Sequence, residues 1–203
     1  MAVELPRGGT VVLIGDSITD AGRVRTDPAS LGCGYAYLVA ALFAARNPGH
    51  RARFVNRGIN GNRVTDLAAR WADDCLAHQP DVVSVMVGIN DCARAFAGGE
   101  AMPAETFAAH YRSILDQAAT RGARLVLLEP FVLPVNQLRA SYRPDLDLKI
   151  QVVRTLAAEF GAALIGTDAL FAEAAAASSA DEWTTDGVHP TPAGHAGCWP
   201  KPG

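Results

Sequence analysis

The chain has 203 residues, of which 49% are hydrophobic and 19% are charged, and its formal net charge is −3 with an isoelectric point near 5.9. A chain of this size and apolar content can bury one substantial core, so we expect a single domain over residues 1–203. The mildly acidic balance offers no broad attraction for nucleic acid or for an anionic membrane surface, which argues against a polyanionic partner.

The sequence contains neither a recognisable targeting segment nor a cysteine motif. The N-terminus has no apolar segment typical of a signal peptide, and no run elsewhere approaches the length of a membrane span, so we expect a cytoplasmic protein with no membrane contact. The four cysteines lack the paired short spacing that binds zinc or cycles between redox states, and we interpret them as reduced thiols: Cys33, Cys75, Cys92 and Cys198.

Short apolar runs alternate with helical patterns along the chain. The runs predict five strands, near 10–15, 52–56, 82–87, 124–129 and 162–166. The segments between and after them predict helices near 34–47, 64–78, 104–120, 145–160 and 168–177. Near-continuous apolar strands in such an alternation are typical of an α/β fold, here a three-layer α/β/α sandwich around a central five-stranded parallel sheet.

The first predicted strand, which includes the β-branched apolar run Val11 to Ile14, ends in Gly15-Asp16-Ser17. The carboxyl edge of a parallel sheet is where open α/β folds collect their ligands. A serine hydroxyl at that edge is a candidate nucleophile, provided that a base takes its proton. We therefore single out Ser17, while Asp16 fits a structural role as a cap that accepts backbone N–H bonds.

Two further segments offer hydrogen-bond donors for a developing oxyanion. Gly61 follows the apolar run Phe54-Val55, and a glycine lets its backbone N–H approach a substrate without a side chain in the way. Asn90 follows the third strand in Gly88-Ile89-Asn90-Asp91 and can point a neutral N–H donor into the same site. Asp91, like Asp16, is expected to cap the local backbone.

The C-terminal part of the chain supplies a base with an orienting carboxylate. In Asp186-Gly187-Val188-His189-Pro190 the carboxylate precedes the imidazole by three residues, and Gly187 lets the backbone turn between them. Asp186 could then accept from His189 and fix its tautomer. Each segment alone could be an ordinary turn, but four of them directly after apolar runs or before caps favour one catalytic site.

These blocks, in this order and spacing, resemble the GDSL/SGNH hydrolases, a family of serine esterases and lipases that includes carbohydrate esterases. The resemblance covers nearly the whole chain. It implies a flavodoxin-like strand order, Ser17 as nucleophile, His189 as general base and then acid, and Asp186 as orienting carboxylate. It also implies an oxyanion hole made by the N–H of Ser17, the N–H of Gly61 and the side chain of Asn90, with no metal and no cofactor.

Specificity is expected from side chains around this hole. The candidates lie beside the catalytic blocks, in the segment after the fourth strand or shortly before Asp186: Ile18, Asn62, Arg63, Ile89, Phe131, Val132, Trp183 and Val188. The resemblance to carbohydrate acetylesterases makes small O-acyl esters the first expectation for the small-molecule substrate. A lipid-type esterase, lysophospholipase or acyl-thioesterase is the alternative.

Two other classes of protein are alternatives to a serine esterase. A metal-dependent phosphoesterase could use Asp16, Asn90, Asp91 and His189 as ligands, and a non-catalytic carbohydrate-binding module could share the fold.

After about residue 197, prolines interrupt the amphipathic helix expected of the family, so that helix is shortened or altered. We hypothesise that the apolar surface left bare favours a homo-oligomer.

Overall fold

The computed structural model describes residues 4–197 of the chain, with one sheet at its centre. The sheet consists of five parallel strands in the order β2-β1-β3-β4-β5, which confirms the predicted parallel sheet and the flavodoxin-like order. The strands are β1 (Thr10–Gly15), β2 (Arg53–Gly58), β3 (Val82–Met86), β4 (Arg124–Leu128) and β5 (Ala163–Ile165).

Four long helices lie close to their predicted ranges: α2 (Tyr35–Arg46), α6 (Ala104–Ala119), α8 (Arg143–Glu159) and α9 (Thr167–Ala177). Shorter helices fill the connections: α1 (Ser17–Asp20), α3 (Val64–Ala69), α4 (Trp71–Asp74), the 3₁₀ helix η1 (Leu76–His78), α5 (Ile89–Phe96), α7 (Gln137–Ser141), α10 (Ala180–Trp183) and α11 (Pro192–Gly197).

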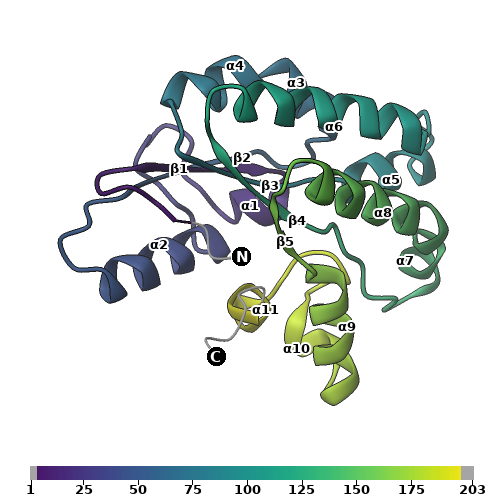
Figure 1. Cartoon of the computed structure of the whole chain (residues 1–203). Coiled ribbons are helices and arrows are strands. Elements are labelled where there is room, and N and C mark those ends of the chain that lie inside the picture. Colours follow the sequence, from purple (N-terminus) through teal and green to yellow (C-terminus); the bar gives the residue numbers. More distant parts are fainter. Residues whose placement is uncertain (1–3, 198–203) are drawn as a thin grey trace.

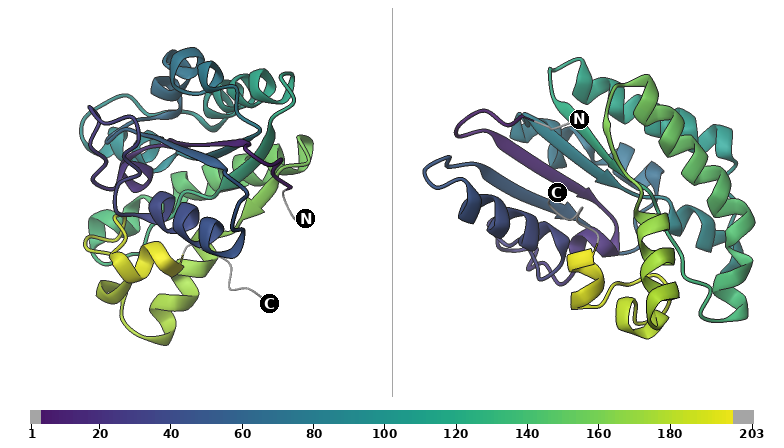
Figure 2. Two further views of the ribbon diagram at one scale, coloured as in Figure 1. Left: turned by 90° about the vertical axis from the view of Figure 1, so that its left-hand side faces the viewer. Right: turned by 60° about the horizontal axis from the view of Figure 1, so that its bottom comes forward.

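The helices cover both faces of the sheet (Figures 1 and 2). On one face, α3, α4, α6 and the C-terminal half of α8 bury an apolar cluster around Trp71, Tyr111 and Leu156. On the other face, α2 and α9 contribute Tyr35 and Phe171 to a second cluster. Alternate residues of the parallel strands supply both clusters, because successive strand side chains point to opposite faces.

Two predicted boundaries were wrong. The helix expected over 64–78 is divided into α3, α4 and η1, and the first break falls at Arg70 (φ −111°, ψ 8°). β2 continues to Gly58, beyond the predicted end at residue 56, because it stays in register with β1 up to the pair Gly15 and Gly58. Apolar patterning missed this extension because Asn56 and Arg57 are polar residues within the strand.

The last described helix, α11, has six residues and ends at Gly197. The expected alteration of the tail beyond it, with Cys198, lies outside the described residues. Across residues 4–197, no helix is both long and apolar enough to cross a membrane.

Candidate active site

The predicted site residues follow the carboxyl ends of neighbouring strands. Ser17 begins α1 directly after β1, Gly61 lies in the loop after β2, and Asn90 is the second residue of α5 after β3. His189 lies in the turn between α10 and α11. Although Ser17 and His189 are 172 residues apart in sequence, the fold brings their side chains into contact.

A continuous series of hydrogen bonds joins the serine, the histidine and the aspartate. Ser17 Oγ lies 2.9 Å from Nε2 of His189, and Nδ1 of His189 lies 3.0 Å from Oδ2 of Asp186. An ionised carboxylate can only accept hydrogen bonds, so Nδ1 must carry the ring hydrogen of the neutral imidazole. The lone pair of Nε2 then faces the Ser17 hydroxyl, as a general base requires.

The turn that carries Asp186 and His189 is closed by its own backbone. Oδ1 of Asp186 accepts the N–H groups of Val188 at 3.0 Å and of His189 at 2.9 Å, and the N–H of Thr185 donates to the carbonyl of His189 at 2.9 Å. Burial by itself would raise the pKa of Asp186, but the two backbone donors and the His189 ring lower it to about 2. The carboxylate is therefore ionised throughout the neutral range.

Two buried aspartates accept backbone N–H groups: Asp16 within its own segment, as predicted, and Asp91 from the start of α3 rather than from its own segment. Oδ1 of Asp16 accepts the N–H of Ile18 at 3.0 Å and thus caps α1, while both carboxylate oxygens of Asp91 lie 3.2 Å from the N–H of Val64 at the start of α3. Burial raises the pKa of Asp16 to about 7, and the charge of Asp91 adds to the shift although the Ile18 bond opposes it. Burial likewise raises the pKa of Asp91 to about 6.

These shifts predict how stability changes with pH. Because the folded pKa of Asp16 exceeds its unfolded value of 3.8, folded protein keeps a proton that unfolded chain releases between about pH 4 and 7. The contribution of Asp16 to the free energy of unfolding should therefore fall as pH rises through that window, by an amount on the order of a few kcal/mol given about 1.4 kcal/mol per pKa unit. Asp16→Asn keeps the capping oxygen but removes the titration, so urea unfolding at pH 4 and pH 7 should give a shallower fall. A slope equal to that of the wild type would contradict the assignment.

Two of the candidate oxyanion donors, Gly61 and Asn90, lie at the corner where the loop after β2 meets the start of α5. Gly61 is exposed, and its φ of +79° lies in the left-handed region that favours glycine. Nδ2 of Asn90 donates to the carbonyl of Asn62 at 3.1 Å, which fixes the orientation of the amide. A side-chain amide has two N–H donors, so this bond uses only one of the two.

Arg70 ties this corner to the sheet, a role that the sequence did not suggest. Its Nε donates to Oδ1 of Asn62 at 2.8 Å, Nη1 donates to the carbonyl of Arg57 at 2.8 Å, and Nη2 donates to the carbonyl of Gly15 at 3.1 Å. One guanidinium therefore connects the ends of β1 and β2 to the residue that holds Asn90. The break between α3 and α4 coincides with this residue.

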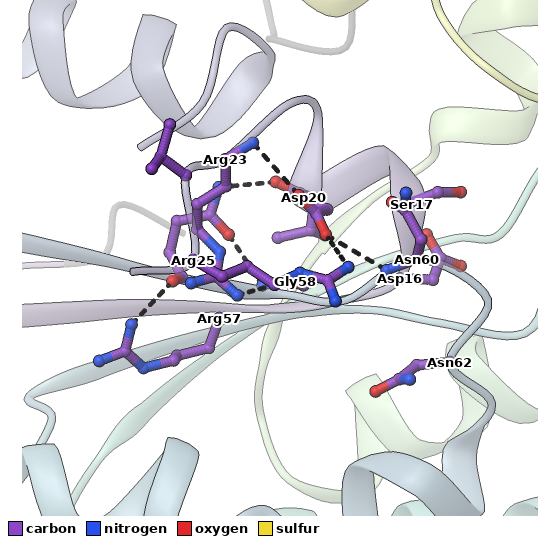
Figure 3. Close-up of polar contacts among 12 residues, drawn as sticks. Asp16, Ser17, Asp20, Arg23, Arg25, Arg57, Gly58, Asn60 and Asn62 are labelled. Atoms are coloured by element: carbon purple, nitrogen blue, oxygen red, sulfur yellow. Dashed lines mark hydrogen bonds and ion pairs between the residues drawn. The ribbon is translucent and has the colours of Figure 1, made fainter. Parts of the chain in front are cut away.

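Asp20 at the end of α1 makes a second tie that the sequence did not indicate. Its Oδ2 accepts the N–H of Asn60 at 3.3 Å and Nη2 of Arg25 at 2.7 Å (Figure 3). The short helix that begins with Ser17 is thus bonded to the loop that carries Gly61. No motif marks Asp20, because the partner that ties it to the loop, Asn60, lies 40 residues away in sequence.

The residues expected to shape specificity fall into two groups. The five aliphatic or phenyl side chains are buried in the second apolar cluster: Ile18, Ile89, Phe131, Val132 and Val188. Phe131 stacks on Phe171 with ring centroids 3.9 Å apart. Asn62, Arg63 and Trp183 are half-buried, and Nε1 of Trp183 donates to Oγ of Ser178 at 2.9 Å. Contact of any of the eight with substrate stays a prediction.

The side chains considered as metal ligands do not gather into a cluster. Among the residues that the structure describes, no group of three or more His, Cys, Asp or Glu side chains could hold a metal ion.

Two described cysteines are buried, and burial raises the pKa of Cys75 and of Cys92 to about 12. Their thiols therefore stay protonated at neutral pH.

Comparison with known proteins gives consistent matches. The family model described as the GDSL-like lipase/acylhydrolase family matches residues 13–196. An acetylxylan esterase from Geobacillus stearothermophilus is 34% identical over 201 residues, covering 95% of this chain and 91% of the relative.

Solved structures agree with this match. A protein from Parabacteroides merdae described as a GDSL-like lipase superposes with a TM-score of 0.92 at 31% identity, covering 96% of this chain and 94% of that chain. The acetylxylan esterase from G. stearothermophilus superposes with a TM-score of 0.85 at 33% identity, covering 96% and 92%. Variants of that esterase in which a serine, an aspartate or a histidine is replaced by alanine are described as catalytic mutants.

Proposed function

Because this chain belongs to the GDSL-like lipase/acylhydrolase family and is a carboxylic ester hydrolase, we propose that it removes short O-acyl groups, acetyl above all, from carbohydrates. The proposal assigns Ser17 as nucleophile, His189 as general base and Asp186 as orienting carboxylate. One observation carries this assignment: the hydrogen-bonded series from Ser17 Oγ through the His189 ring to Asp186. The alanine variants of the related esterase, which affect the same three residue types, support it.

In the first half of the proposed reaction, Nε2 of His189 takes the proton of Ser17 as Oγ attacks the ester carbonyl carbon. The negative charge that develops on the carbonyl oxygen is stabilised by the N–H of Ser17, the N–H of Gly61 and Nδ2 of Asn90. Asp186 stabilises the imidazolium electrostatically and keeps its own charge. When the tetrahedral intermediate collapses, the C–O bond to the alcohol breaks and His189 returns its proton to the alcohol oxygen.

In the second half, water replaces the alcohol. His189 removes a proton from water as the water oxygen attacks the acyl-enzyme, and the same three donors hold the new oxyanion. The bond between the acyl carbon and Ser17 Oγ then breaks, His189 protonates the serine, and the free acid leaves. The acyl-enzyme therefore splits one hydrolysis into two steps that use the same base.

Two features support a bulky alcohol and a small acyl group. The side chain of His189 is 49% exposed and Gly61 is exposed, which leaves room for a sugar beside the reacting carbonyl. Ile18 and Ile89, which flank Ser17 and Asn90 in sequence, are 1% and 2% exposed and belong to the packed core. The 34% identity to an acetylxylan esterase further supports a carbohydrate as the alcohol part of the substrate.

A panel of esters tests this proposal. With p-nitrophenyl esters of increasing chain length and with acetylated xylo-oligosaccharides, kcat/KM should be highest for acetyl and should fall by at least about tenfold toward octanoyl. A longer acyl chain without a matching pocket gains no binding free energy from its methylenes and displaces the carbonyl carbon from Ser17 Oγ. Acetate release from the oligosaccharides should be readily measured. The Ser17→Ala variant serves as the blank.

The outcomes separate the alternatives. A maximum at long acyl chains would replace the carbohydrate proposal by a lipid-type esterase, and selective cleavage of acyl thioesters would replace it by a thioesterase. Hydrolysis that is unchanged in Ser17→Ala would overturn the proposed nucleophile.

A further inference from the structure

Arg139 contacts the carboxylate of Asp186 from a helix outside the catalytic segments. Its Nη2 donates to Oδ2 of Asp186 at 2.6 Å, and its Nε donates to the backbone carbonyl of the same residue at 2.9 Å. Two of the three guanidinium nitrogens therefore bind one residue, while Nη1 lies 3.4 Å from Oη of Tyr142. In such a two-pronged contact, arginine adds directional precision to charge. The side chain of Arg139 is only 19% exposed, so solvent screens this ion pair less than an ordinary surface pair.

Arg139 completes the set of donors around this carboxylate. An ionised carboxylate has about four lone-pair sites. Oδ1 receives the two backbone N–H groups of Val188 and His189, and Oδ2 receives Nδ1 of His189 and Nη2 of Arg139. With all four sites occupied, the carboxylate cannot rotate about its Cβ–Cγ bond without losing hydrogen bonds.

The arginine is itself held on several sides. Oδ1 of Asn136 caps α7 by accepting the N–H of Arg139 at 2.9 Å, and the guanidinium lies 5.4 Å from the centre of the Tyr142 ring. At Gly187 (φ +90°), an added Cβ would lie 3.2 Å from Cγ of Arg139 and 2.6 Å from the carbonyl oxygen of Leu133. The backbone of the catalytic turn therefore packs directly on the segment that carries Arg139, and the N–H of Leu133 donates to the carbonyl of Gly187 at 2.8 Å.

From these contacts we propose that Arg139 is a positioning residue for ester hydrolysis. Its guanidinium holds the Asp186 carboxylate in the orientation that aligns the His189 ring with Ser17 Oγ. This inference rests on the proposed roles of Ser17, His189 and Asp186. Arg139 acts through Asp186, so its loss should slow the chemical step more than it weakens substrate binding.

A matched pair of arginine variants tests the proposal. Arg139→Ala should lower kcat for p-nitrophenyl acetate about 10- to 100-fold, while KM changes by no more than about threefold. Arg112→Ala is the control, because Arg112 also makes a two-pronged contact, with Glu159 at 2.8 and 2.9 Å, but on an exposed surface between α6 and α8. Its kcat should match that of the wild type.

Chemical rescue distinguishes positioning from general loosening of the loop. Guanidinium chloride at millimolar concentration, well below the denaturing range, should raise kcat of Arg139→Ala in a saturable manner and leave Arg112→Ala and Ser17→Ala unchanged. If Arg139→Ala does not fold, as judged by circular dichroism, Arg139→Gln is measured by the same kinetic criteria, with the fall in kcat expected to be smaller.

Three results would overturn the inference. A folded Arg139 variant could keep the wild-type kcat, or its kcat could fall only by the same factor by which its KM rises. In folded Arg139→Ala, guanidinium could also fail to restore the lost kcat. Failure of the catalytic assignment would look different. In that case Ser17→Ala itself would keep its activity, whatever the Arg139 variants do.

Discussion

Replacing Ser17 by alanine is expected to lower kcat for p-nitrophenyl acetate by about 10⁴- to 10⁶-fold, the largest effect of any single substitution proposed for this chain. Alanine leaves no oxygen to attack the carbonyl carbon, so no acyl-enzyme forms. His189→Ala should cost a comparable factor, because an unassisted serine hydroxyl is a poor nucleophile at neutral pH. Steady-state rates measured with release of p-nitrophenolate give both numbers.

The two variants should also be non-additive, since the residues act on one proton transfer. The double variant should be about as slow as either single variant. Ser113→Ala, which removes an exposed hydroxyl on α6, is the control for the chemical change itself. Ser17→Ala protein that keeps wild-type activity after contaminating esterases are excluded would refute the assignment of the nucleophile.

Asn90→Ala should lower kcat by about 10²- to 10³-fold with a smaller change in KM, the cost typical of losing one oxyanion donor. The effect falls on kcat because the oxyanion exists in the tetrahedral intermediate and only weakly in the bound ester. Asn90→Asp has nearly the same shape but replaces the donor with an acceptor, so it should be at least as slow. Kinetics with p-nitrophenyl acetate and acetylated xylo-oligosaccharides measure both variants.

Asn47 offers a matched control for this substitution. Its Nδ2 donates to the carbonyl of Phe43 at 2.9 Å at the end of α2, just as Asn90 donates to the carbonyl of Asn62. Asn47→Ala therefore removes the same kind of bond at an exposed position and should leave kcat unchanged. Equal kinetics of the two variants would remove Asn90 from the oxyanion hole.

The sequence predicted those parts of the fold that depend on local patterning. The apolar runs located all five strands to within two residues at either end, because buried parallel strands are nearly continuous in Val, Ile and Leu. The short helices α5 and α7 were missed, since a few residues contain too little periodicity to distinguish a helix from a loop. The last two residues of β2 were missed for a different reason: polar residues at the end of the strand interrupt the apolar run by which a buried strand is recognised.

For the candidate site, the sequence located residues within motifs and missed those that support them. Ser17, His189 and Asp186 belong to short segments with recognisable chemistry, and the structure places these three in contact. Arg70, Asp20 and Arg139 act on partners far away in the chain, such as Gly15, Asn60 and Asp186. Arginine and aspartate are common on protein surfaces, so only the folded arrangement identifies these three.

The long separation between Ser17 and His189 has a consequence for synthesis of the chain. A ribosome that has released only the first four strands has delivered the hydroxyl but not the imidazole, so a nascent chain cannot hydrolyse esters early. Esterase activity should accordingly appear only after the segment that carries Asp186 and His189 has been synthesised.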